Sequence, residues 1–349
     1  MKVVQIGEHL MGGGRPCVIA AEVGLNHNGD MELAKRVIDA AADAGANAVK
    51  FQNYRTEDFI SDRSATYKYI SRGKTVVESQ YEMFKRHELS GAALCELKAH
   101  CDRRGVLFHS TPTSESGVFD LLEMGVSVLK NGSDHLTHLQ LIRAMGQTGL
   151  PTLLSTGMGT LAEIDEAVRT FRETGNDQLV LLHCVSSYPT PSEDVHLTKI
   201  PALAEVFGCP VGFSDHTDGI AAAIGAVVFG ACWIERHFTI DKSLPGPDHR
   251  FSSDPNDLLA LIEAVRAVEK SLGNPLIGPA SSETTGRQAF RLSCVAAKDL
   301  PANHCLADSD IVFRRPGTGL PPKARDRLVG RRTSRSVAAG HVFEMGDLA

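Results

Sequence analysis

The sequence predicts an α/β protein in which a (β/α)₈ TIM barrel is followed by a small second domain. Runs rich in Val, Ile, Leu and Phe alternate with amphipathic helical patterns along most of the 349 residues. Continuous apolar strands separated by helices are typical of a parallel sheet covered by helices, and eight such units indicate a closed barrel. The end of the chain lacks this alternation, which indicates a separate domain. A doubly wound open sheet is the alternative for the first part.

Strand-like runs occupy residues 17–23, 48–52, 106–111, 126–132, 151–157, 179–186, 210–216 and 232–239. Helical patterns, in which apolar residues recur at spacings of three and four, occupy residues 31–45, 116–125, 161–175, 219–230 and 257–273. Thr160 and Glu163 predict a capping box at the start of one helix. The polar segment 54–89 is too long for an ordinary connection, so we expect an irregular excursion over the top of the barrel.

A Gly/Pro/Ser-rich stretch separates the last helix from the end of the chain. We expect a TIM-barrel catalytic domain over 1–272, a linker over 273–285 and a small β-rich domain over 286–349. Short strand-like pieces within that domain occupy residues 293–300, 310–319 and 341–348. A domain of this size is near the lower limit for folding alone.

Composition excludes several classes of protein. Hydrophobic residues make up 42% of the chain and charged residues 22%, which excludes a disordered or fibrous protein. The formal charge is −6, but residues 286–349 hold 11 Lys and Arg against 6 Asp and Glu. No aromatic residues are interleaved with the arginine pairs at 314–315 and 331–332, so we expect a solvated face or a dimer arm and no nucleic-acid partner.

The eight cysteines include no C-x-x-C pair and lie mostly in apolar segments. They indicate buried free thiols in a reducing compartment, without disulfides or a zinc site. The amino terminus lacks the apolar core of a signal peptide, and the longest apolar run, 219–234, is too short to span a membrane. The glycine-rich string MGGGRP precedes a strand and predicts a turn. We therefore expect a soluble, cytoplasmic protein with no membrane partner.

Polar residues end all eight predicted strands. Because the carboxyl ends of the strands form the active site in a barrel of this kind, these residues are expected to lie together. They are Glu22; Lys50 and Gln52; Ser110 and Thr111; Lys130 and Ser133; Ser155 and Thr156; Ser186 and Tyr188; Ser214 and His216; Glu235 and His237. Alternate residues of a strand share one face, so the pair Glu235 and His237 faces the mouth together.

His216 and His237 predict a site for one divalent cation. They end neighbouring strands at matching depth, and imidazole nitrogens bind divalent metals while leaving positions open for water or a substrate oxygen. The alternative is that His216 is a turn or capping residue and that His237 is a hydrogen-bonded core histidine.

Lys50 and Lys130 interrupt apolar strands, which is costly unless each charge meets a counter-charge or a ligand. With the hydroxyls of Thr111, Ser133, Ser155 and Ser214 they predict a cradle for a phosphate or carboxylate. One alternative is a structural ion pair with Glu22 or Glu235. Another is a lysine that forms a Schiff base.

A set of strings at these strand ends resembles the sialic acid synthase family, the phosphoenolpyruvate-dependent nonulosonic acid synthases. The strings are AEVGLNHNGD, AVKFQ, STP, LLSTGMGTLAEI, LLHCVSSYPTP, GFSDHT, ERHFT, GPDH and, near the end of the chain, RPGTGLPPK. The likeness runs from about residue 14 to the carboxyl terminus. It implies a barrel followed by an antifreeze-like (SAF) domain, in a homodimer that exchanges these domains.

The resemblance also implies roles for individual residues. His216 and His237 match the ligands of a manganese or magnesium ion, and Glu22 and Glu235 match acid/base residues. Positions that hold phosphoenolpyruvate are matched by Lys50, Thr111, Lys130, Ser133, Ser155, Ser186 and Ser214. Sugar contacts are matched by Gln52, Tyr188 and Asp248, and Arg315 matches an arginine that the exchanged domain sends to the neighbouring subunit's site.

The family reaction joins phosphoenolpyruvate to the aldehyde of an open-chain amino sugar and releases phosphate. The acceptor is N-acetylmannosamine, which gives N-acetylneuraminate, or a diacetamido trideoxy hexose, which gives a legionaminate- or pseudaminate-type product. Two departures bear on this choice: Ser186 stands where many members carry Asn, and Asp134-His135 stands where Gly-Glu is common. A non-enzymatic antifreeze-like binding module is disfavoured because the basic tail lacks the weakly charged face of ice binders.

Overall fold

The computed structural model describes residues 2–349, which form two compact units. The larger unit extends to Gly273, and the smaller one comprises Asn274–Ala349. The boundary falls where we expected a linker to begin, and residues 274–285 group with the smaller unit. Among the described residues, no helix combines the length and the hydropathy needed to cross a membrane.

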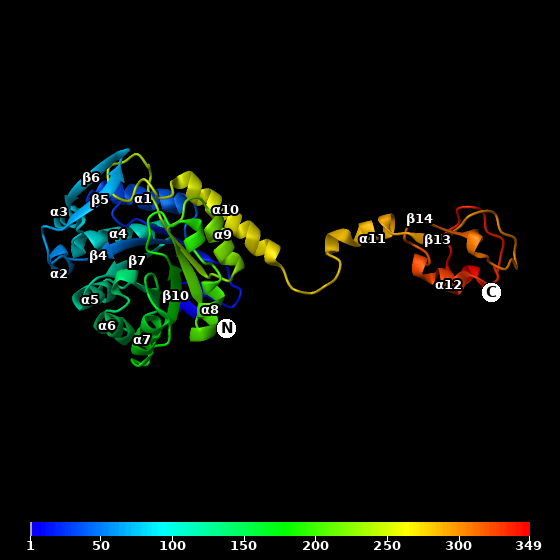
Figure 1. Cartoon of the computed structure of the whole chain (residues 1–349), viewed down its shortest axis with the longest axis horizontal. Coiled ribbons are helices and arrows are strands. Elements are labelled where there is room, and N and C mark those ends of the chain that lie inside the picture. Colours follow the sequence, from blue (N-terminus) through cyan, green and yellow to red (C-terminus); the bar gives the residue numbers. More distant parts are fainter. Residues whose placement is uncertain (1) are drawn as a thin grey trace. The chain divides into compact units, whose positions relative to one another are not determined.

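The larger unit is a parallel eight-stranded barrel (Figure 1). Its strands are β3 (Val18–Glu22), β4 (Ala48–Asn53), β7 (Leu107–Pro112), β8 (Leu129–Asn131), β9 (Thr152–Ser155), β10 (Leu179–Cys184), β11 (Val211–Asp215) and β12 (Trp233–His237). The hydrogen-bonded order is β7-β4-β3-β12-β11-β10-β9-β8, and β7 also packs against β8. Because the first and last strands, β3 and β12, pair directly, the barrel is closed and the open sheet is excluded.

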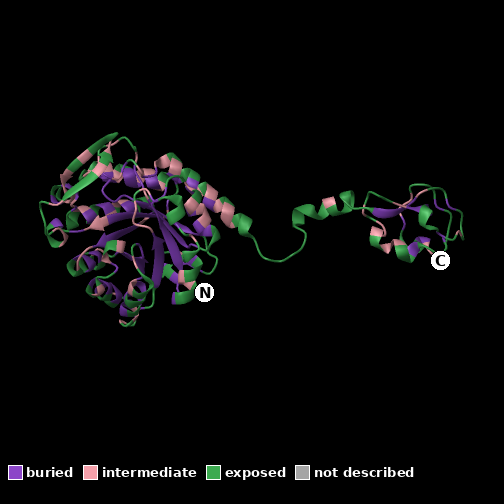
Figure 2. Ribbon diagram, viewed as in Figure 1, coloured by how far each residue is buried: buried purple, intermediate pink, exposed green. Residues whose placement is uncertain are grey.

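A helix follows each strand and covers the outside of the barrel. The covering helices are α1 (Met31–Asp43), α4 (Gly91–Arg104), α5 (Glu115–Glu123), α6 (Leu139–Gln147), α7 (Leu161–Arg172), α8 (Lys199–Phe207), α9 (Ala221–Val228) and α10 (Pro255–Leu272). The predicted capping box is confirmed, since Thr160 Oγ1 accepts from the Glu163 amide and the Glu163 carboxylate accepts from the Thr160 amide. Figure 2 shows the barrel strands largely buried and the outer faces of these helices exposed.

A short hairpin, which the sequence analysis did not predict, closes the floor of the barrel. Strand β1 (Val4–Ile6) pairs antiparallel with β2 (His9–Met11). Val4, Ile6 and Met11 pack with Val18 and Trp233, the first residues of β3 and β12, inside the amino-terminal end of the barrel. Strands of three residues are too short to show a period, which explains why the pattern was missed. The glycine-rich string after β2 is the predicted turn, with Gly12 at φ +89°.

The excursion at residues 54–89 is more regular than expected. It contains helix α2 (Thr56–Phe59), an antiparallel hairpin of β5 (Thr66–Ser71) and β6 (Lys74–Ser79), and helix α3 (Gln80–His87). Both faces of the hairpin carry polar residues, so the alternation of polar and apolar residues that indicates a strand is absent from its sequence. Tyr54 and Met83 from this segment form a small apolar cluster with Leu25.

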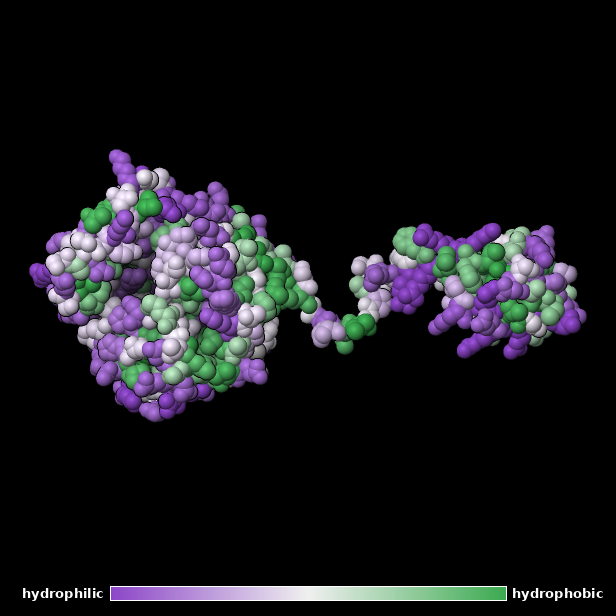
Figure 3. Space-filling view, viewed as in Figure 1, coloured by the Kyte–Doolittle hydropathy of each residue, from purple (hydrophilic) through white to green (hydrophobic). Residues whose placement is uncertain are grey.

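The smaller unit contains α11 (Thr284–Phe290), β13 (Ser293–Ala296), β14 (Ile311–Arg314) and α12 (Arg325–Leu328) around an apolar core. Strands β13 and β14 pair antiparallel. The strand-like piece at 341–348 was predicted wrongly: it makes only isolated bridges at Val342 and Leu348, and Met345–Asp347 is a 3₁₀ turn. Its buried Phe343 belongs to the core although the backbone is irregular. Figure 3 shows hydrophilic side chains over much of this unit's surface.

The smaller unit repeats one pattern, at residues 298–311 and 335–348. Corresponding residues are Lys298 and Arg335, Leu300 and Val337, His304 and His341, Leu306 and Phe343, and Asp310 and Asp347. In each copy the buried aspartate pairs with the basic residue and the histidine, and it accepts the backbone N–H of the residue three positions earlier. The copies meet through the antiparallel bridge between Leu300 and Val337.

Candidate active site

The carboxyl ends of the barrel strands surround a cavity of about 370 Å³. Interior positions along each strand alternate with positions that face the helices, so every second residue reaches this cavity. Fourteen of the fifteen predicted site residues line it: Glu22, Lys50, Gln52, Thr111, Lys130, Ser133, Ser155, Ser186, Tyr188, Ser214, His216, Glu235, His237 and Asp248. The fifteenth, Arg315, lies in the smaller unit, where its guanidinium carbon is 5.2 Å from the centre of the Phe290 ring.

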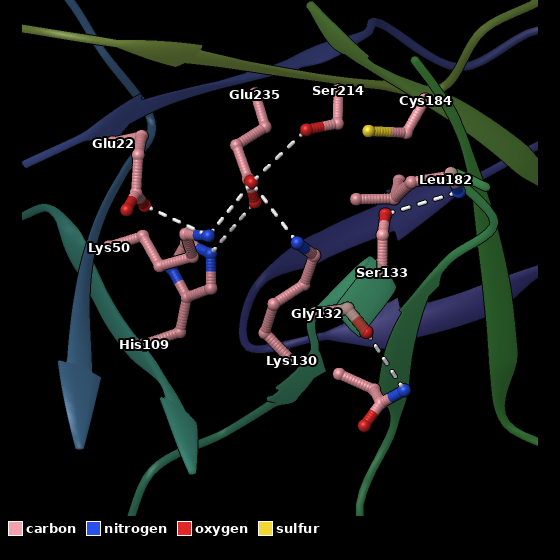
Figure 4. Close-up of polar contacts among 12 residues, drawn as sticks. Glu22, Lys50, His109, Lys130, Gly132, Ser133, Leu182, Cys184, Ser214 and Glu235 are labelled. Atoms are coloured by element: carbon pink, nitrogen blue, oxygen red, sulfur yellow. Dashed lines mark hydrogen bonds and ion pairs between the residues drawn. The ribbon is translucent and has the colours of Figure 1, made fainter. Parts of the chain in front are cut away.

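Two lysines and two glutamates form a buried charge cluster at the bottom of the cavity (Figure 4). Lys50 Nζ lies 3.0 Å from Glu22 Oε2 and 2.9 Å from Glu235 Oε1. Lys130 Nζ lies 3.1 Å from the same Glu235 oxygen, and Ser214 Oγ donates to it at 3.4 Å. The ion pairs that the sequence analysis raised as an alternative are therefore present. They are compatible with an anion site, because two ammonium groups carry six N–H bonds and these contacts engage only some of them.

Hydroxyl groups around the lysines add unused hydrogen-bonding capacity. Thr111 Oγ1 and Ser155 Oγ are buried without a partner. Buried polar groups rarely stay unpaired in folded proteins, so these hydroxyls indicate the place of a ligand. A phosphate or carboxylate is the chemistry that two lysines and several hydroxyls fit best.

The cluster shifts the pKa values of its members. Burial lowers the pKa of Lys50 to about 8 despite the neighbouring Glu235, and Lys130 adds to the decrease. Burial alone would raise the pKa of Glu235, but Lys130 and Lys50 outweigh it and hold that pKa well below its usual value. Without a ligand, Glu235 is therefore a weak base held by both lysines.

The two predicted metal ligands stand side by side at the mouth, with ring centres 5.6 Å apart. His216 Nδ1 donates to the Val185 carbonyl at 2.8 Å, which leaves the Nε2 lone pair free to bind a cation. His237 Nδ1 is buried without a hydrogen-bond partner and lies 4.0 Å from Asp248 Oδ2. Within residues 2–349 no group of three or more His, Cys, Asp or Glu is arranged as a complete metal site. Two imidazoles thus fit one divalent cation whose other ligands are water and substrate.

Burial also perturbs the groups beside this histidine pair. Burial, reinforced by His216, places the pKa of His237 well below its usual value, so its imidazole is neutral as a metal ligand requires. Burial raises the pKa of Asp248 to about 6. Gly24, at φ +50°, lies between these groups: an added Cβ would be 3.1 Å from Glu22 Oε1 and 3.4 Å from His237 Cε1. Glycine at this position lets Glu22 Oε1 lie close to His237, one of the two histidines.

The glycine-bearing turn after β9 shapes the end of the cavity that holds the two lysines. A Cβ at Gly157 would be 2.6 Å from both Ser133 Oγ and Ser186 Oγ. The Gly157 amide donates to Ser133 Oγ at 3.1 Å. Glycine is therefore required for these two hydroxyls to approach one another.

Sequence reasoning missed three features of the cavity. His109 lies beneath the charge cluster, and the string VLFHST offered only a histidine inside an apolar strand. Cys184 Sγ lies 3.9 Å from His216 Nδ1. An apolar wall is formed by Leu25, Tyr54, Phe59, Met83 and Phe84, most of which come from the excursion that showed no readable period.

The fold and the cavity are those of a (β/α)₈-barrel enzyme, whose active site lies at the carboxyl ends of the strands. The chain belongs to the NeuB family, the nonulosonic acid synthases: the NeuB family model matches residues 37–276, and the SAF domain model matches residues 293–349. This confirms the resemblance found in the sequence. The chain is thus a phosphoenolpyruvate-dependent nonulosonic acid synthase with a carboxyl-terminal SAF domain.

Individual relatives are similar over nearly the whole chain. An N,N′-diacetyllegionaminic acid synthase of Legionella pneumophila is 39% identical over 333 residues, which cover 94% of each chain. An uncharacterized protein of Methanocaldococcus jannaschii is 40% identical over 348 residues, 100% of this chain and 99% of the other. The crystal structure of an N-acetylneuraminic acid synthetase from Leptospira borgpetersenii, in complex with citrate, is 35% identical with a TM-score of 0.74, and the match covers 82% of this chain and 95% of that chain.

Proposed function

We propose that this synthase condenses phosphoenolpyruvate with 2,4-diacetamido-2,4,6-trideoxymannose and water to give N,N′-diacetyllegionaminate and phosphate. The observation that carries this choice of acceptor is the apolar wall of Leu25, Tyr54, Phe59, Met83 and Phe84 opposite the charged end of the cavity. This sugar ends in a methyl group and carries a second acetamido group, whereas N-acetylmannosamine has hydroxyls at the corresponding carbons. Apolar side chains favour the less polar acceptor. The name of the Legionella relative agrees with it.

The donor occupies the lysine end. The phosphate and carboxylate of phosphoenolpyruvate take the free N–H bonds of Lys50 and Lys130 and the unpaired hydroxyls of Thr111 and Ser155. Ser133, Ser186 and Ser214 complete this end of the cavity. No covalent bond to lysine is needed, because phosphoenolpyruvate is already a carbon nucleophile.

The two glutamates divide the proton transfers between the two ends of the cavity. The methylene carbon of phosphoenolpyruvate forms a bond to the aldehyde carbon, water adds to C2, and the C2–O bond to phosphate then breaks. Glu235 lies between the donor lysines and takes the proton of that water. Glu22 Oε1 lies across Gly24 from His237, and Glu22 handles the proton transfer to the oxygen of the former aldehyde. Binding of the donor anion to the lysines raises the pKa of Glu235 and makes it a stronger base.

The acceptor lies at the mouth. Asp248, Gln52 and the half-exposed Tyr188 surround it, and the Tyr188 ring is tilted against that of His216, with ring centres 4.2 Å apart. His216 and His237 hold Mn²⁺, with Mg²⁺ as the alternative. When bound, the cation supplies a Lewis acid for the aldehyde oxygen. Arg315 reaches this acceptor from the other subunit of a homodimer that exchanges SAF domains.

A comparison of acceptors tests the proposal. The purified chain, with phosphoenolpyruvate and Mn²⁺, should release phosphate with kcat/KM at least about tenfold higher for the diacetamido trideoxy sugar than for N-acetylmannosamine, since one apolar contact is worth about 1–3 kcal/mol. Product mass identifies the nonulosonic acid. The near-isosteric Met83→Gln variant makes the apolar wall more polar, so the ratio of kcat/KM between the two acceptors should become smaller. Equal or better use of N-acetylmannosamine would refute the acceptor and leave the synthase assignment intact.

The metal site is tested by a separate pair of variants. His237→Ala and His216→Ala should abolish Mn²⁺ binding measured by calorimetry and reduce turnover to the level seen in excess chelator. His183→Asn, which alters a buried histidine bonded to the Val195 carbonyl outside this cavity, is the control and should bind Mn²⁺ normally. Full activity of the wild type in chelator would contradict the proposed metal.

A further inference from the structure

His109 is buried directly beneath the charge cluster, in a position where an apolar side chain would suffice. It lies on β7 beside Lys50 in the strand register and is 0% exposed. Neither ring nitrogen has a hydrogen-bond partner. A buried polar group without a partner destabilises the folded protein, so the histidine is disfavoured here unless it gains a partner during function.

The only group of opposite charge within reach is the second oxygen of Glu235. His109 Nε2 lies 3.9 Å from Glu235 Oε2, as the dashed line in Figure 4 indicates. That oxygen is itself buried without a hydrogen bond, while Oε1 of the same carboxylate accepts from Lys50, Lys130 and Ser214. The carboxylate is therefore bound on one side only, and the unbound oxygen points at the imidazole.

Donor binding changes this balance, because the anion and Glu235 compete for the same two ammonium groups. As the lysines turn toward the anion, Glu235 Oε1 loses part of its hydrogen bonding, and Oε2 has no partner of its own. A neutral imidazole with its proton on Nε2 would donate to Oε2 after a movement of about 1 Å, to a normal bond length near 2.9 Å. Burial lowers the pKa of His109, which keeps the ring neutral and avoids a third cation beside the lysines.

We propose that His109 is a positioning residue that holds Glu235 in place when phosphoenolpyruvate occupies the two lysines. This inference rests on the proposed function, since it assigns a role within the same reaction. The imidazole touches neither substrate nor the reacting atoms. It acts by fixing the carboxylate that receives the proton of the attacking water.

The neighbouring Trp233 gives the inference an independent readout. The His109 and Trp233 rings meet edge to face, with centres 5.3 Å apart, and Trp233 is the only tryptophan in the chain. A shift of the imidazole toward Glu235 on donor binding therefore changes the surroundings of a single fluorophore. Its emission can be followed without turnover, without an acceptor and without metal.

The test compares three substitutions of His109. His109→Gln places an amide N–H where Nε2 stands, His109→Asn places one nearer the position of Nδ1, and His109→Phe keeps a ring against Trp233 without any donor. We expect kcat to fall at least tenfold in the Phe and Asn variants and to stay within threefold of wild type in the Gln variant. Melting temperatures should be equal within a few degrees, which separates positioning from a loss of fold.

Titration of the metal-free proteins with phosphoenolpyruvate completes the test. The emission of Trp233 should change in the wild type and lose most of that change in the Phe variant, although calorimetry shows that the donor still binds. Wild-type kcat in the Phe variant, or a Gln variant as impaired as Phe while still folded, would overturn the inference. A wild type that releases no phosphate from phosphoenolpyruvate with either acceptor would instead overturn the proposed function.

Discussion

At the scale of single residues, the site is an arrangement of opposite charges that a ligand must rearrange. Lys50 and Lys130 are held by Glu235 in the free protein, so the two ammonium groups that would bind the donor share part of their N–H bonds with the proposed base. The attraction is strong because the cluster is buried. Removing one member changes both the affinity for an anion and the strength of the base.

Glu235→Gln should separate these two effects. The lysines lose a competing carboxylate, so the Kd for phosphoenolpyruvate should decrease several-fold, while kcat should fall at least about 100-fold because the general base is absent. Calorimetry measures the first quantity and steady-state phosphate release the second. Glu22 pairs with Lys50 alone, so Glu22→Gln should lower the Kd for phosphoenolpyruvate less than Glu235→Gln does. Weaker donor binding in a folded Glu235→Gln protein would argue against competition for the lysines.

The positions of the ligating and charged residues could be predicted because strand periodicity and barrel topology together decide which side chains reach the mouth. Their partners could not be predicted. Nothing in the sequence indicates that Glu235 uses one oxygen for both lysines, or that His109 lies opposite the other. Those contacts depend on how β7 is staggered relative to β4 and β12. The spacing of apolar residues in a single sequence does not give this stagger.

At the scale of elements, buried histidines join three segments around the mouth. His27 follows β3, His87 ends α3, and His249 lies in the loop after β12. The His27 and His87 rings are 6.1 Å apart. His249 Nε2 donates to Asn28 Oδ1 at 3.4 Å, and its Nδ1 forms a hydrogen bond of 2.7 Å with Thr239 Oγ1. These contacts tie the excursion to the loop that carries Asp248.

Acid should loosen this junction. Burial lowers the pKa of His27 to about 3 and that of His249 to about 4. Each folded-state pKa is below the unfolded value near 6.5, so the stabilisation is complete above pH 6.5 and is lost as the pH falls toward these values. Each group contributes about 1.4 kcal/mol per pH unit within that window.

Denaturant unfolding between pH 7 and pH 4.5 measures this loss. His27→Asn keeps an acceptor for the Gly29 amide but does not titrate, so its unfolding free energy should depend less steeply on pH. His9→Asn, at a half-buried position on the floor hairpin away from this junction, is the matched control. Parallel slopes for wild type and His27→Asn would show that His27 is not linked to folding in this range.

The sequence predicted long, periodic elements well and short ones poorly. The eight barrel strands lie within the predicted runs or extend them by one residue, because burial on both faces leaves a continuous apolar signature. Hairpins β1–β2 and β5–β6 were missed since three-residue strands or two polar faces leave no such signature. The irregular backbone of 341–348 was mistaken for a strand because the half-buried Val342 and the buried Phe343 are apolar although they form no continuous strand pairing.

At the scale of the whole molecule, the barrel holds fourteen of the proposed site residues and the SAF unit holds Arg315. The proposed exchange of SAF domains between subunits makes a distinctive prediction for mixtures of two variants. Neither His237→Ala nor Arg315→Ala should be active alone. After the two inactive proteins are unfolded and refolded together, half of the dimers are mixed and each has one intact site, so roughly a quarter of wild-type activity should return.

The control for this mixture is a variant pair within one unit. His237→Ala refolded with Lys130→Ala should not recover activity, because both changes affect the barrel and no exchange can restore a complete site. Absence of recovery with Arg315→Ala, in dimers verified by light scattering, would contradict the exchange. Domain count and order could be predicted from length, composition and motif order, whereas the grouping of residues 274–285 with the smaller unit depends on packing.

The hairpin under the barrel floor has a kinetic consequence. With Val4, Ile6 and Met11 filling the amino-terminal end, both substrates share one entrance at the mouth. The donor lysines are almost fully buried, whereas Tyr188 at the rim is half exposed, so a bound acceptor stands in the path of the donor. The order of arrival is then imposed by geometry, with phosphoenolpyruvate first and the sugar second. An acceptor present in excess should therefore slow the enzyme, and phosphoenolpyruvate should relieve that inhibition.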